Sequence, residues 1–361
     1  MMRKRKMAYL MHVDVDWIKQ RPHFIAEKLA GHFHIDLYHV RNMRSARVKN
    51  PKSRSDSVVA FKILKVPYSS RCRWLKRFEQ IINCGTVSRL YKESYHLVWI
   101  TSPIILDFVD VEWLGRQKIV YDCMDDVLAF SLPRSIVLQL EKHELWLAKH
   151  SALILASSEE LRKRIKMRYG IEAKVVHNAL EPGKFSFFGG SKTEGRFFSL
   201  GYFGTIADWF DFETIIAVLD RLPEVRLLLI GPAECMIPKH DRILHMPPVR
   251  HEALNDILHQ IDALIMPFKV NELIRAVDPV KAYEYIATGL PSVLVKYDET
   301  EKFGNYSYLY ENSEELIQII EKLSSKKIGP KQKESTTRAF VRDNDWDNRV
   351  KLILSLLENV V

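Results

Sequence analysis

The sequence predicts an α/β protein of two domains, each with a mostly parallel β-sheet covered by helices. Short apolar segments typical of buried strands alternate with amphipathic helical segments along most of the chain. The alternation stops at residues 181–197, where glycine, proline and polar residues gather without an apolar period, and then starts again. A chain of 361 residues is also too long for one core of ordinary size.

The first domain, residues 1–180, begins with a predicted strand at 7–12 and a first helix at 22–32, which a second strand follows directly. Further strands are predicted at 58–66, 95–102, 118–124, 152–157 and 173–178. Further helices are predicted at 132–150 and 159–169. Ligands collect at the carboxyl ends of parallel strands, so the loops that follow these strands are the first places to look for a site.

The second domain, residues 198–340, has predicted strands at 198–203, 226–230, 263–267 and 292–295, and helices at 212–222, 250–260, 280–288 and 314–323. Residues 181–197 are interpreted as the linker between the domains. In residues 341–361, Trp346, Val350 and Ile353 recur at helical spacing. They predict a closing helix that can return to the first domain.

Composition indicates a soluble globular protein, with 47% hydrophobic and 27% charged residues. The longest apolar runs, such as 152–156 and 227–230, are far shorter than the roughly 20 residues of a membrane span. Asp14 and Asp16 interrupt the apolar run near the N-terminus before a signal-peptide core forms. The 4 cysteines show neither metal-ligand spacing nor a disulfide framework, which favours a reducing cytoplasm.

A net charge of +9 indicates an anionic partner, which can be nucleic acid, a phosphorylated ligand or acidic lipid. The basic residues concentrate in the first domain. They include Arg3, Lys4, Arg5, Lys6, Arg41, Arg44, Arg47, Lys49, Lys52, Arg54, Arg71, Arg73, Lys76 and Arg77.

Residues 271–291 combine a loop, a helix start and charged side chains in a pattern that suits a nucleotide. The first turn of a helix leaves N–H groups unpaired and carries partial positive charge, so a diphosphate can bind there. Arg275 and Lys281 add positive charge, and Glu284 can accept hydrogen bonds from ribose hydroxyls. The alternative is an ordinary surface helix.

A second glycine-containing turn, Gly204-Thr205, follows the predicted strand 198–203 and permits a close backbone approach to a ligand. The sequence contains neither a GxGxxG fingerprint nor a GxxxxGK[ST] phosphate loop. These absences disfavour nicotinamide and ATP chemistry.

Carboxylates follow two predicted strands of the first domain. Asp125 and Asp126 come after strand 118–124, and Asp16 comes after the first strand, close to Trp17 and Arg21. A carboxylate there can bind an acceptor or take the proton from its hydroxyl, or it can simply cap a turn. Asp16 and Asp126 are the candidate catalytic residues, and Trp17, Arg21 and Asp125 are assigned to the acceptor side.

The segment Asp14-Val15-Asp16 also matches the DxD pattern with which some enzymes hold a metal ion and a diphosphate. It lies at the end of the first strand, and the match is short enough to arise by chance. We therefore expect no required metal, with the diphosphate charge offset by Lys281, Arg275 and the helix end.

Around residues 71–85, an apolar stripe of Trp74, Leu75, Phe78, Ile81 and Ile82 is flanked by cations. We expect Trp74 and Phe78 to dock on a membrane together with the cations Arg73, Lys76 and Arg77. This composition is typical of an interfacial membrane helix. The alternative is that the stripe packs on the sheet.

Several phrases of the sequence together resemble bacterial surface-polysaccharide glycosyltransferases of the GT-B architecture, of the teichuronic acid and exopolysaccharide type. They are DWIKQRPH, VYDCMDD, VVHNALEP, LGYFGTIADWFDFETI, DPVKAYEYIATGLP and WDNRV, in this order over nearly the full length. The resemblance implies two Rossmann-like domains facing across a cleft. It further implies transfer of a sugar from a nucleotide diphosphate donor to a lipid-linked or growing polysaccharide, and a UDP-linked sugar is the expected donor.

By this resemblance, the glutamate that grips the donor ribose is Glu284, and the glycine loop facing the diphosphate is Gly204-Thr205. The phosphate side is assigned to Asp278-Pro279 and Lys281. The remaining residues assigned to the donor are Asn178, Arg275 and Tyr283, although Asn178 can instead satisfy the backbone of the hinge between the domains. Many retaining relatives carry a second glutamate eight positions before the ribose glutamate, where this chain has Ala276. Glu272 or Asp278 can substitute, and the stereochemical outcome stays open.

The expected partners are a nucleotide-sugar donor, a glycan or lipid-linked acceptor and an anionic membrane surface, with no cofactor and no nucleic acid. The expected location is the cytoplasm, at the inner face of the plasma membrane. Two rival functions stay open: a nucleotide-sugar epimerase of the same architecture, and a non-catalytic basic protein that binds nucleic acid or membrane.

Overall fold

The computed structural model describes residues 5–43, 57–189, 197–249 and 251–360. It divides into a first unit, Met1–Asn178 with Trp346–Val361, and a second unit, Ala179–Asp345. Seven of the basic residues named above lie outside the described residues, as do residues 190–196 of the predicted linker and residue 250 of the predicted helix 250–260. They are Arg3, Lys4, Arg44, Arg47, Lys49, Lys52 and Arg54.

The sheet of the first unit is parallel throughout its described strands, in the order β3-β2-β1-β4-β5-β6-β7. Its strands are β1 (Arg5–Met11), β2 (Phe33–Asn42), β3 (Val58–Lys65), β4 (Leu97–Ile100), β5 (Ile119–Cys123), β6 (Leu153–Ala156) and β7 (Lys174–Val175). The central strands β1, β4 and β5 are apolar and almost fully buried, as expected for a parallel sheet covered on both faces.

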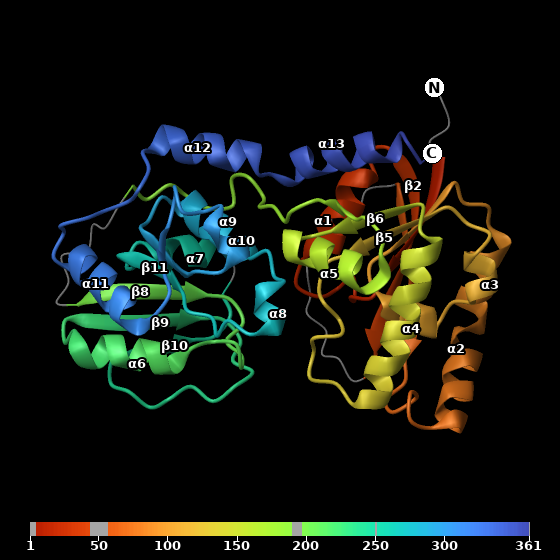
Figure 1. Ribbon diagram of the computed structural model, residues 1–361, viewed down its shortest axis with the longest axis horizontal. Helices are drawn as coiled ribbons and strands as arrows, with labels where there is room; N and C mark the ends of the chain where they lie inside the picture. Colours follow the sequence, from red (N-terminus) through yellow and green to blue (C-terminus); the bar gives the residue numbers. More distant parts are fainter. Residues whose placement is uncertain (1–4, 44–56, 190–196, 250, 361) are drawn as a thin grey trace. The chain divides into compact units, whose positions relative to one another are not determined.

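Helices cover both faces of this sheet (Figure 1). They are α1 (Arg21–Leu29), α2 (Arg73–Lys92), η1 (Pro103–Asp107), α3 (Val111–Leu114), α4 (Arg134–His150), α5 (Glu159–Tyr169) and α13 (Trp346–Leu357). Pro22 occupies the tolerated first turn of α1, and Gly170 ends α5 in the left-handed conformation. Helix α13, from the end of the chain, packs against α1, where Trp346 stacks on Phe24 with centroids 5.1 Å apart.

The second unit has a parallel sheet in the order β10-β9-β8-β11-β12-β13 among its described strands. The strands are β8 (Phe198–Phe203), β9 (Val225–Ile230), β10 (Ile243–Met246), β11 (Ala263–Met266), β12 (Ser292–Val295) and β13 (Tyr308–Tyr310). From β8 the chain builds outward to one side and, from β11, to the other. The strand order therefore reverses between β8 and β11, the position at which such sheets bind ligands.

The helices of the second unit are α6 (Phe212–Arg221), α7 (His251–Leu258), α8 (Glu272–Arg275), α9 (Val280–Thr288), α10 (Asp298–Glu301), α11 (Ser313–Ser324) and α12 (Glu334–Asp343). Helices α6 and α11 pack together, and α12 packs on α9 at the other face of the sheet (Figure 1). Asp211 and Asn312 cap α6 and α11 through their side chains.

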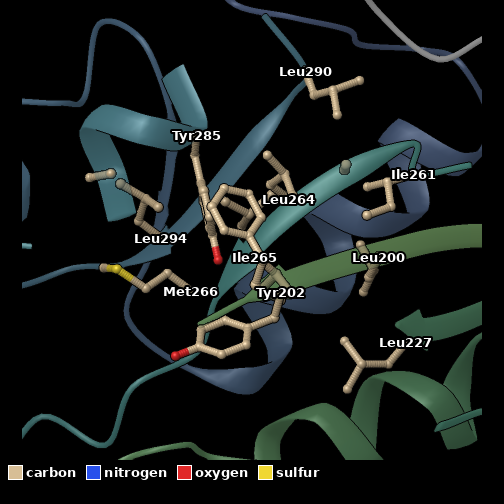
Figure 2. Packing of buried hydrophobic residues seen from close by; sticks show 14 of the residues in the cluster. Leu200, Tyr202, Leu227, Ile261, Leu264, Ile265, Met266, Tyr285, Leu290 and Leu294 are labelled. Atoms are coloured by element: carbon tan, nitrogen blue, oxygen red, sulfur yellow. The ribbon is translucent and has the colours of Figure 1, made fainter. Parts of the chain in front are cut away.

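Figure 2 shows the apolar core of this second unit. Side chains from β8, β9 and β11 meet those of α9 and β12. The residues labelled there are Leu200, Tyr202, Leu227, Ile261, Leu264, Ile265, Met266, Tyr285, Leu290 and Leu294. Gly201 in β8 lies against Ile261, and a side chain at that position would overlap it. The core thus fixes β8 and α9 relative to each other, and both contribute to the site described below.

The predicted elements and the structure differ in the linker, in one strand and in several short or polar elements. Residues 181–189, predicted as linker, belong to the second unit. The strand predicted at 173–178 is paired over Lys174–Val175 within the described chain. The sequence reading also omitted several elements: η1, α3, α8, α10, α12, β10 and β13. None of the described helices is long and apolar enough to cross a membrane.

Candidate functional site

The candidate donor site lies at the carboxyl end of β8, where the strand order of the second unit reverses. The strand ends at Phe203, and Gly204 follows with a φ of 138°, in the region that favours glycine. A Cβ on Gly204 would overlap Cε and Nζ of Lys281, the second residue of α9. Lys281 Nζ also lies 5.7 Å from the centre of the Phe203 ring. The predicted glycine turn and the predicted lysine are therefore in contact.

Glu284 lies one turn further along α9, between two lysines. Its Oε2 is 3.9 Å from Lys281 Nζ, and its Oε1 is 3.5 Å from Nζ of Lys184. The Glu284 side chain is 13% exposed, so its carboxylate remains accessible to a ligand. Burial lowers the pKa of Lys281, while Glu284 acts to raise it. The site thus combines one carboxylate, two ammonium groups and an open glycine backbone.

A second glycine supports this turn. Gly231 follows β9 with a φ of 141°, and a Cβ there would overlap the carbonyl oxygen of Gly204. The Gly204 N–H donates to the Ile230 carbonyl at 2.8 Å. The backbones of Gly204 and Gly231, at the ends of two adjacent strands, are therefore in close contact. The sequence predicted the turn at Gly204-Thr205 but not the role of Gly231.

Asp278 and Tyr283, both predicted to bind the donor, are buried and bonded to each other. The Tyr283 hydroxyl donates to the Asp278 carboxylate at 3.2 Å, and Lys302 Nζ lies 2.7 Å from Asp278 Oδ1. These contacts fix the loop that leads into α9, so the two side chains position the site. Arg275, at the end of α8, is exposed.

Ala276 is buried at the end of α8, so the second glutamate position of the resemblance holds no charge. Of the two substitutes that the sequence left open, Asp278 has its carboxylate engaged by Lys302 and Tyr283. Glu272 is exposed at the start of α8.

In the first unit, Asp126 forms a buried cluster with two arginines of α5. Its Oδ2 is 2.7 Å from Arg164 Nη1 and 2.7 Å from Arg168 Nη2. Burial raises the pKa of Asp126, but the hydrogen bonds from the arginines outweigh it, and the net shift is downward. The candidate catalytic Asp126 thus has a structural task, and its arginine partners were not recognised in the sequence because they lie about forty residues away.

Arg21, predicted on the acceptor side, is likewise buried, at 3% exposure. Its Nη2 donates to Asp122 at 2.8 Å, and its Nη1 donates to the Val176 carbonyl at 2.7 Å and to Asn178 Oδ1 at 3.4 Å. Asn178 belongs to the first unit, and its carbonyl accepts from Arg349 of α13 at 3.2 Å. The contacts described for Asn178 are thus with Arg21 and Arg349 of the first unit.

Asp16, the other candidate catalytic residue, lies in the loop after β1, and its side chain is 39% exposed. Arg41, from the end of β2, lies 3.4 Å from both Asp16 Oδ2 and Asp14 Oδ2. Asp14 also accepts the backbone N–H of Asp16 at 3.1 Å, forming a turn. Trp17 is 36% exposed beside this turn. The DxD carboxylates are thus held by a basic residue of the same unit.

Two titratable groups near the carboxyl ends of these strands have strongly shifted pKa values. Burial raises the pKa of Asp125 to about 6, with Asp122 and Asp126 adding to the rise against Arg21. Burial lowers the pKa of His12 to about 4, and its Nδ1 is 2.8 Å from Thr101 Oγ1. His12 is therefore neutral at pH 7.

Helix α2 presents the predicted apolar stripe on its outer side. Trp74, Phe78 and Ile81 are 69%, 46% and 68% exposed, whereas Glu79 and Asn83 face the protein. The alternative that the stripe packs on the sheet is therefore wrong for these three residues. Arg73 and Arg77 are exposed beside them. Lys76, the third predicted docking cation, instead donates to Glu79 at 2.9 Å and to the Asp107 carbonyl at 2.8 Å.

No family model matches the chain. Among curated proteins, it is 26% identical over 256 residues to a Bacillus subtilis (strain 168) protein named "Putative teichuronic acid biosynthesis glycosyltransferase TuaH". The match spans 64% of this chain and 64% of that relative, so it covers less than two thirds of the relative's length.

Solved structures show the same fold. Sucrose-phosphate synthase from Thermosynechococcus elongatus is 12% identical with a TM-score of 0.71, over 98% of this chain and 99% of that one. Anabaena HepE in complex with UDP-glucose is 12% identical with a TM-score of 0.68, again over 98% and 99%. The predicted fold class, two Rossmann-like sheets of the GT-B type, is confirmed. The resemblance drawn from the motifs is confirmed as well, since the curated relative is named a putative glycosyltransferase of teichuronic acid biosynthesis.

Proposed function

We propose that this protein is a glycosyltransferase that moves a sugar from a UDP-linked donor to a lipid-linked or growing polysaccharide acceptor. The observation that carries the proposal is the contact of Gly204, Lys281 and Glu284 at the strand-order reversal of the second unit. The name of the Bacillus relative supports a role in surface-glycan synthesis, and the UDP-glucose bound by HepE supports the donor class.

In this proposal the donor diphosphate lies at the start of α9, where the N–H groups of the first turn lack intrahelical partners. Gly204 permits the backbone to approach the phosphates, and Lys281 supplies positive charge. The ribose hydroxyls donate to Glu284. The positive charge of Lys281 and of the first turn of α9 stabilises the negative charge that develops on the leaving diphosphate as its bond to the sugar breaks.

The same charges are our reason to propose that the reaction needs no metal. Lysine ammonium groups and a helix end can take the place that a divalent cation holds in other transferases. Transfer measured after dialysis against a chelator should then keep its rate. A rate restored by adding back Mg²⁺ or Mn²⁺ would contradict this part.

We assign the acceptor to the first unit, with Asp16 as the carboxylate that takes the proton from the attacking hydroxyl. Asp16 is the accessible member of the two candidate carboxylates, because Asp126 is enclosed by arginines. Asp16→Asn should lower kcat for transfer and leave UDP affinity unchanged. An unchanged kcat would remove Asp16 from the reaction.

We further propose that α2 docks on the anionic inner face of the plasma membrane. Trp74, Phe78 and Ile81 supply the apolar face, and Arg73 and Arg77 supply the charge. The double change Trp74→Ser with Phe78→Ser should abolish sedimentation with vesicles containing phosphatidylglycerol. Because both side chains are exposed, the free energy of unfolding should stay within about 0.5 kcal/mol of the wild type. Retained sedimentation would contradict docking through this face.

The decisive experiment for the donor is titration calorimetry with UDP on the wild type and on Glu284→Ala. Loss of hydrogen bonds to a charged group should weaken binding by about 1–3 kcal/mol. If the wild type binds no UDP but binds random DNA in a salt-dependent way, the non-catalytic alternative is favoured. If UDP-sugars are converted to epimers without any acceptor, the epimerase alternative is favoured.

A further inference from the structure

Lys184 is the one member of the donor cluster that neither the motifs nor the resemblance assigns to a role. Its Nζ lies 3.5 Å from Glu284 Oε1 and 3.9 Å from Glu181 Oε2, and its side chain is 19% exposed. Glu284 therefore meets Lys184 through one oxygen and Lys281 through the other. A ribose hydroxyl that approaches either oxygen of Glu284 therefore meets a carboxylate oxygen that faces a lysine ammonium.

The segment that carries Lys184 is anchored on both sides of it. Asn255 of α7 donates through Nδ2 to the Lys184 carbonyl at 3.3 Å and accepts the Ser186 N–H through Oδ1 at 3.1 Å. The Phe185 ring lies against Phe203, the last residue of β8, with centroids 5.5 Å apart.

The same segment continues onto the end of α9. Phe188 donates its N–H to the Thr288 carbonyl at 2.7 Å, and Phe187 fills the space over Gly289, where a Cβ would overlap its ring. The backbone of residues 184–188 is thus fixed to β8, α7 and α9. The position of Lys184 beside Glu284 is built into the second unit.

When a donor binds, the Lys184 ammonium therefore exchanges the Glu284 carboxylate for another anion. A ribose that donates to Glu284 removes an acceptor from the Lys184 ammonium, which has a flexible stem and can turn to a new anion. A diphosphate attached to that ribose supplies such an anion at the same site, whereas a nucleoside supplies none. Binding of a nucleoside therefore leaves an ion pair broken, and binding of a nucleoside diphosphate replaces it.

We propose that Lys184 is a specificity-determining residue of the donor site: it pairs with Glu284, and it turns to the donor diphosphate when a donor binds. This inference rests on the proposed function. Its consequence is discrimination, since Lys184 weakens the binding of nucleosides and strengthens the binding of nucleoside diphosphates.

Titration calorimetry with two probes, uridine and UDP, tests the proposal. For Lys184→Met we expect UDP to bind about tenfold more weakly, the scale of a lost charge-assisted hydrogen bond. We expect uridine to bind about two- to fivefold more tightly, because a partly exposed ion pair no longer has to be broken. Lys184→Arg keeps the charge and should retain the wild-type preference for UDP.

The matched control is Lys322→Met, which removes a positive charge from an exposed position of α11 in the same unit and should change neither affinity. Equal losses of uridine and UDP affinity in Lys184→Met, or an unchanged UDP affinity, would overturn the proposal while leaving the proposed function intact. Failure of the wild type to bind UDP would instead reject the proposed function. If Lys184→Met does not fold, Lys184→Gln is measured in its place against the same expectations.

Discussion

Gly204 is the position at which the donor site leaves least room. Its φ of 138° is one that side chains rarely adopt, and an added Cβ would overlap Lys281. We expect Gly204→Ala to displace Lys281 and to weaken UDP binding about tenfold, the scale of one charge-assisted hydrogen bond. The free energy of unfolding should fall by about 1–3 kcal/mol because the backbone is strained. Calorimetry and urea unfolding measure the two effects.

Gly85 offers a matched control, since it lies inside α2 and nothing is found within 4 Å of an added Cβ. Gly85→Ala should raise the free energy of unfolding by about 0.5–1 kcal/mol, the ordinary gain in a helix interior. A Gly204→Ala protein with wild-type UDP affinity would show that the Gly204–Lys281 contact plays no part in binding.

Asp126 should make the first unit sensitive to acid. Its pKa is raised by burial but lowered more by the arginines, so the net folded pKa lies below the unfolded value. A carboxyl of this kind contributes stability above its unfolded pKa of about 4, and the contribution disappears as the pH falls through the folded value. Asp126→Asn should therefore be less stable at neutral pH, by about 1.5–3 kcal/mol, the scale of a lost hydrogen bond to a charged group, while Arg164 keeps Glu160 and Arg168 keeps Glu144.

The difference between wild type and Asp126→Asn should shrink as the pH is lowered below 4, which urea unfolding at several pH values can follow. Glu159→Gln is the control, because its pair with Arg162 is exposed to solvent and should contribute little to the free energy of unfolding. A difference that stays constant down to pH 2 would show that the ionised carboxylate is not what stabilises the cluster.

At the scale of elements, α13 completes the first unit. Trp346 is 1% exposed and stacks on Phe24 of α1, and Lys28 of α1 pairs with Asp347 at 2.7 Å. Trp346→Ala should lower the free energy of unfolding by about 3–5 kcal/mol, the usual cost of removing a large buried aromatic side chain. Hydrogen exchange should speed up in β1 and α1 and stay unchanged in β8 and α9.

Leu352 lies on the same helix but is 43% exposed, so Leu352→Ala controls for changes in α13 that do not affect its buried face. We expect a loss of less than about 1 kcal/mol for this variant. If Trp346→Ala instead speeds exchange in the second unit, the assignment of α13 to the first unit is wrong.

Elements with a continuous apolar signal could be predicted to their ends. Strands β8 and β12 and helices α5 and α9 match their predicted bounds, because buried runs, capping residues and terminal glycines mark them. Strand β10 could not, since it is half exposed and carries no apolar run. Helix α12 buries few side chains, among them Thr337 and Phe340, so its pattern resembles that of a loop.

The candidate site could be predicted in part. Gly204, Lys281 and Glu284 follow strands or begin a helix, so chain order already brings them to one edge of a sheet. Lys184 could not be found, because its segment is glycine- and proline-rich by composition. Its aromatic residues, Phe185, Phe187 and Phe188, could have indicated that the segment packs against the second domain. The partners of Arg21 and Asp126 depend on tertiary contacts that spacing does not reveal.

At the scale of the whole molecule, two units with separate sheets should unfold in two transitions. UDP binds the second unit in our proposal, so it should raise the melting temperature of one transition and leave the other in place. Differential scanning calorimetry with and without UDP measures this. Trp346→Ala should lower the transition that UDP does not move. A shift of both transitions together would show that the units unfold as one.

The first unit is completed by a segment that is synthesised after the second unit. Its sheet is encoded before residue 179 and its helix α13 after residue 345, with the whole second unit between them. During synthesis, Phe24 therefore lacks its stacking partner Trp346 until the second unit has left the ribosome. The first unit can therefore reach its full stability only after the second unit has been synthesised. A nascent chain halted before Trp346 should present the apolar side of α1 to chaperones.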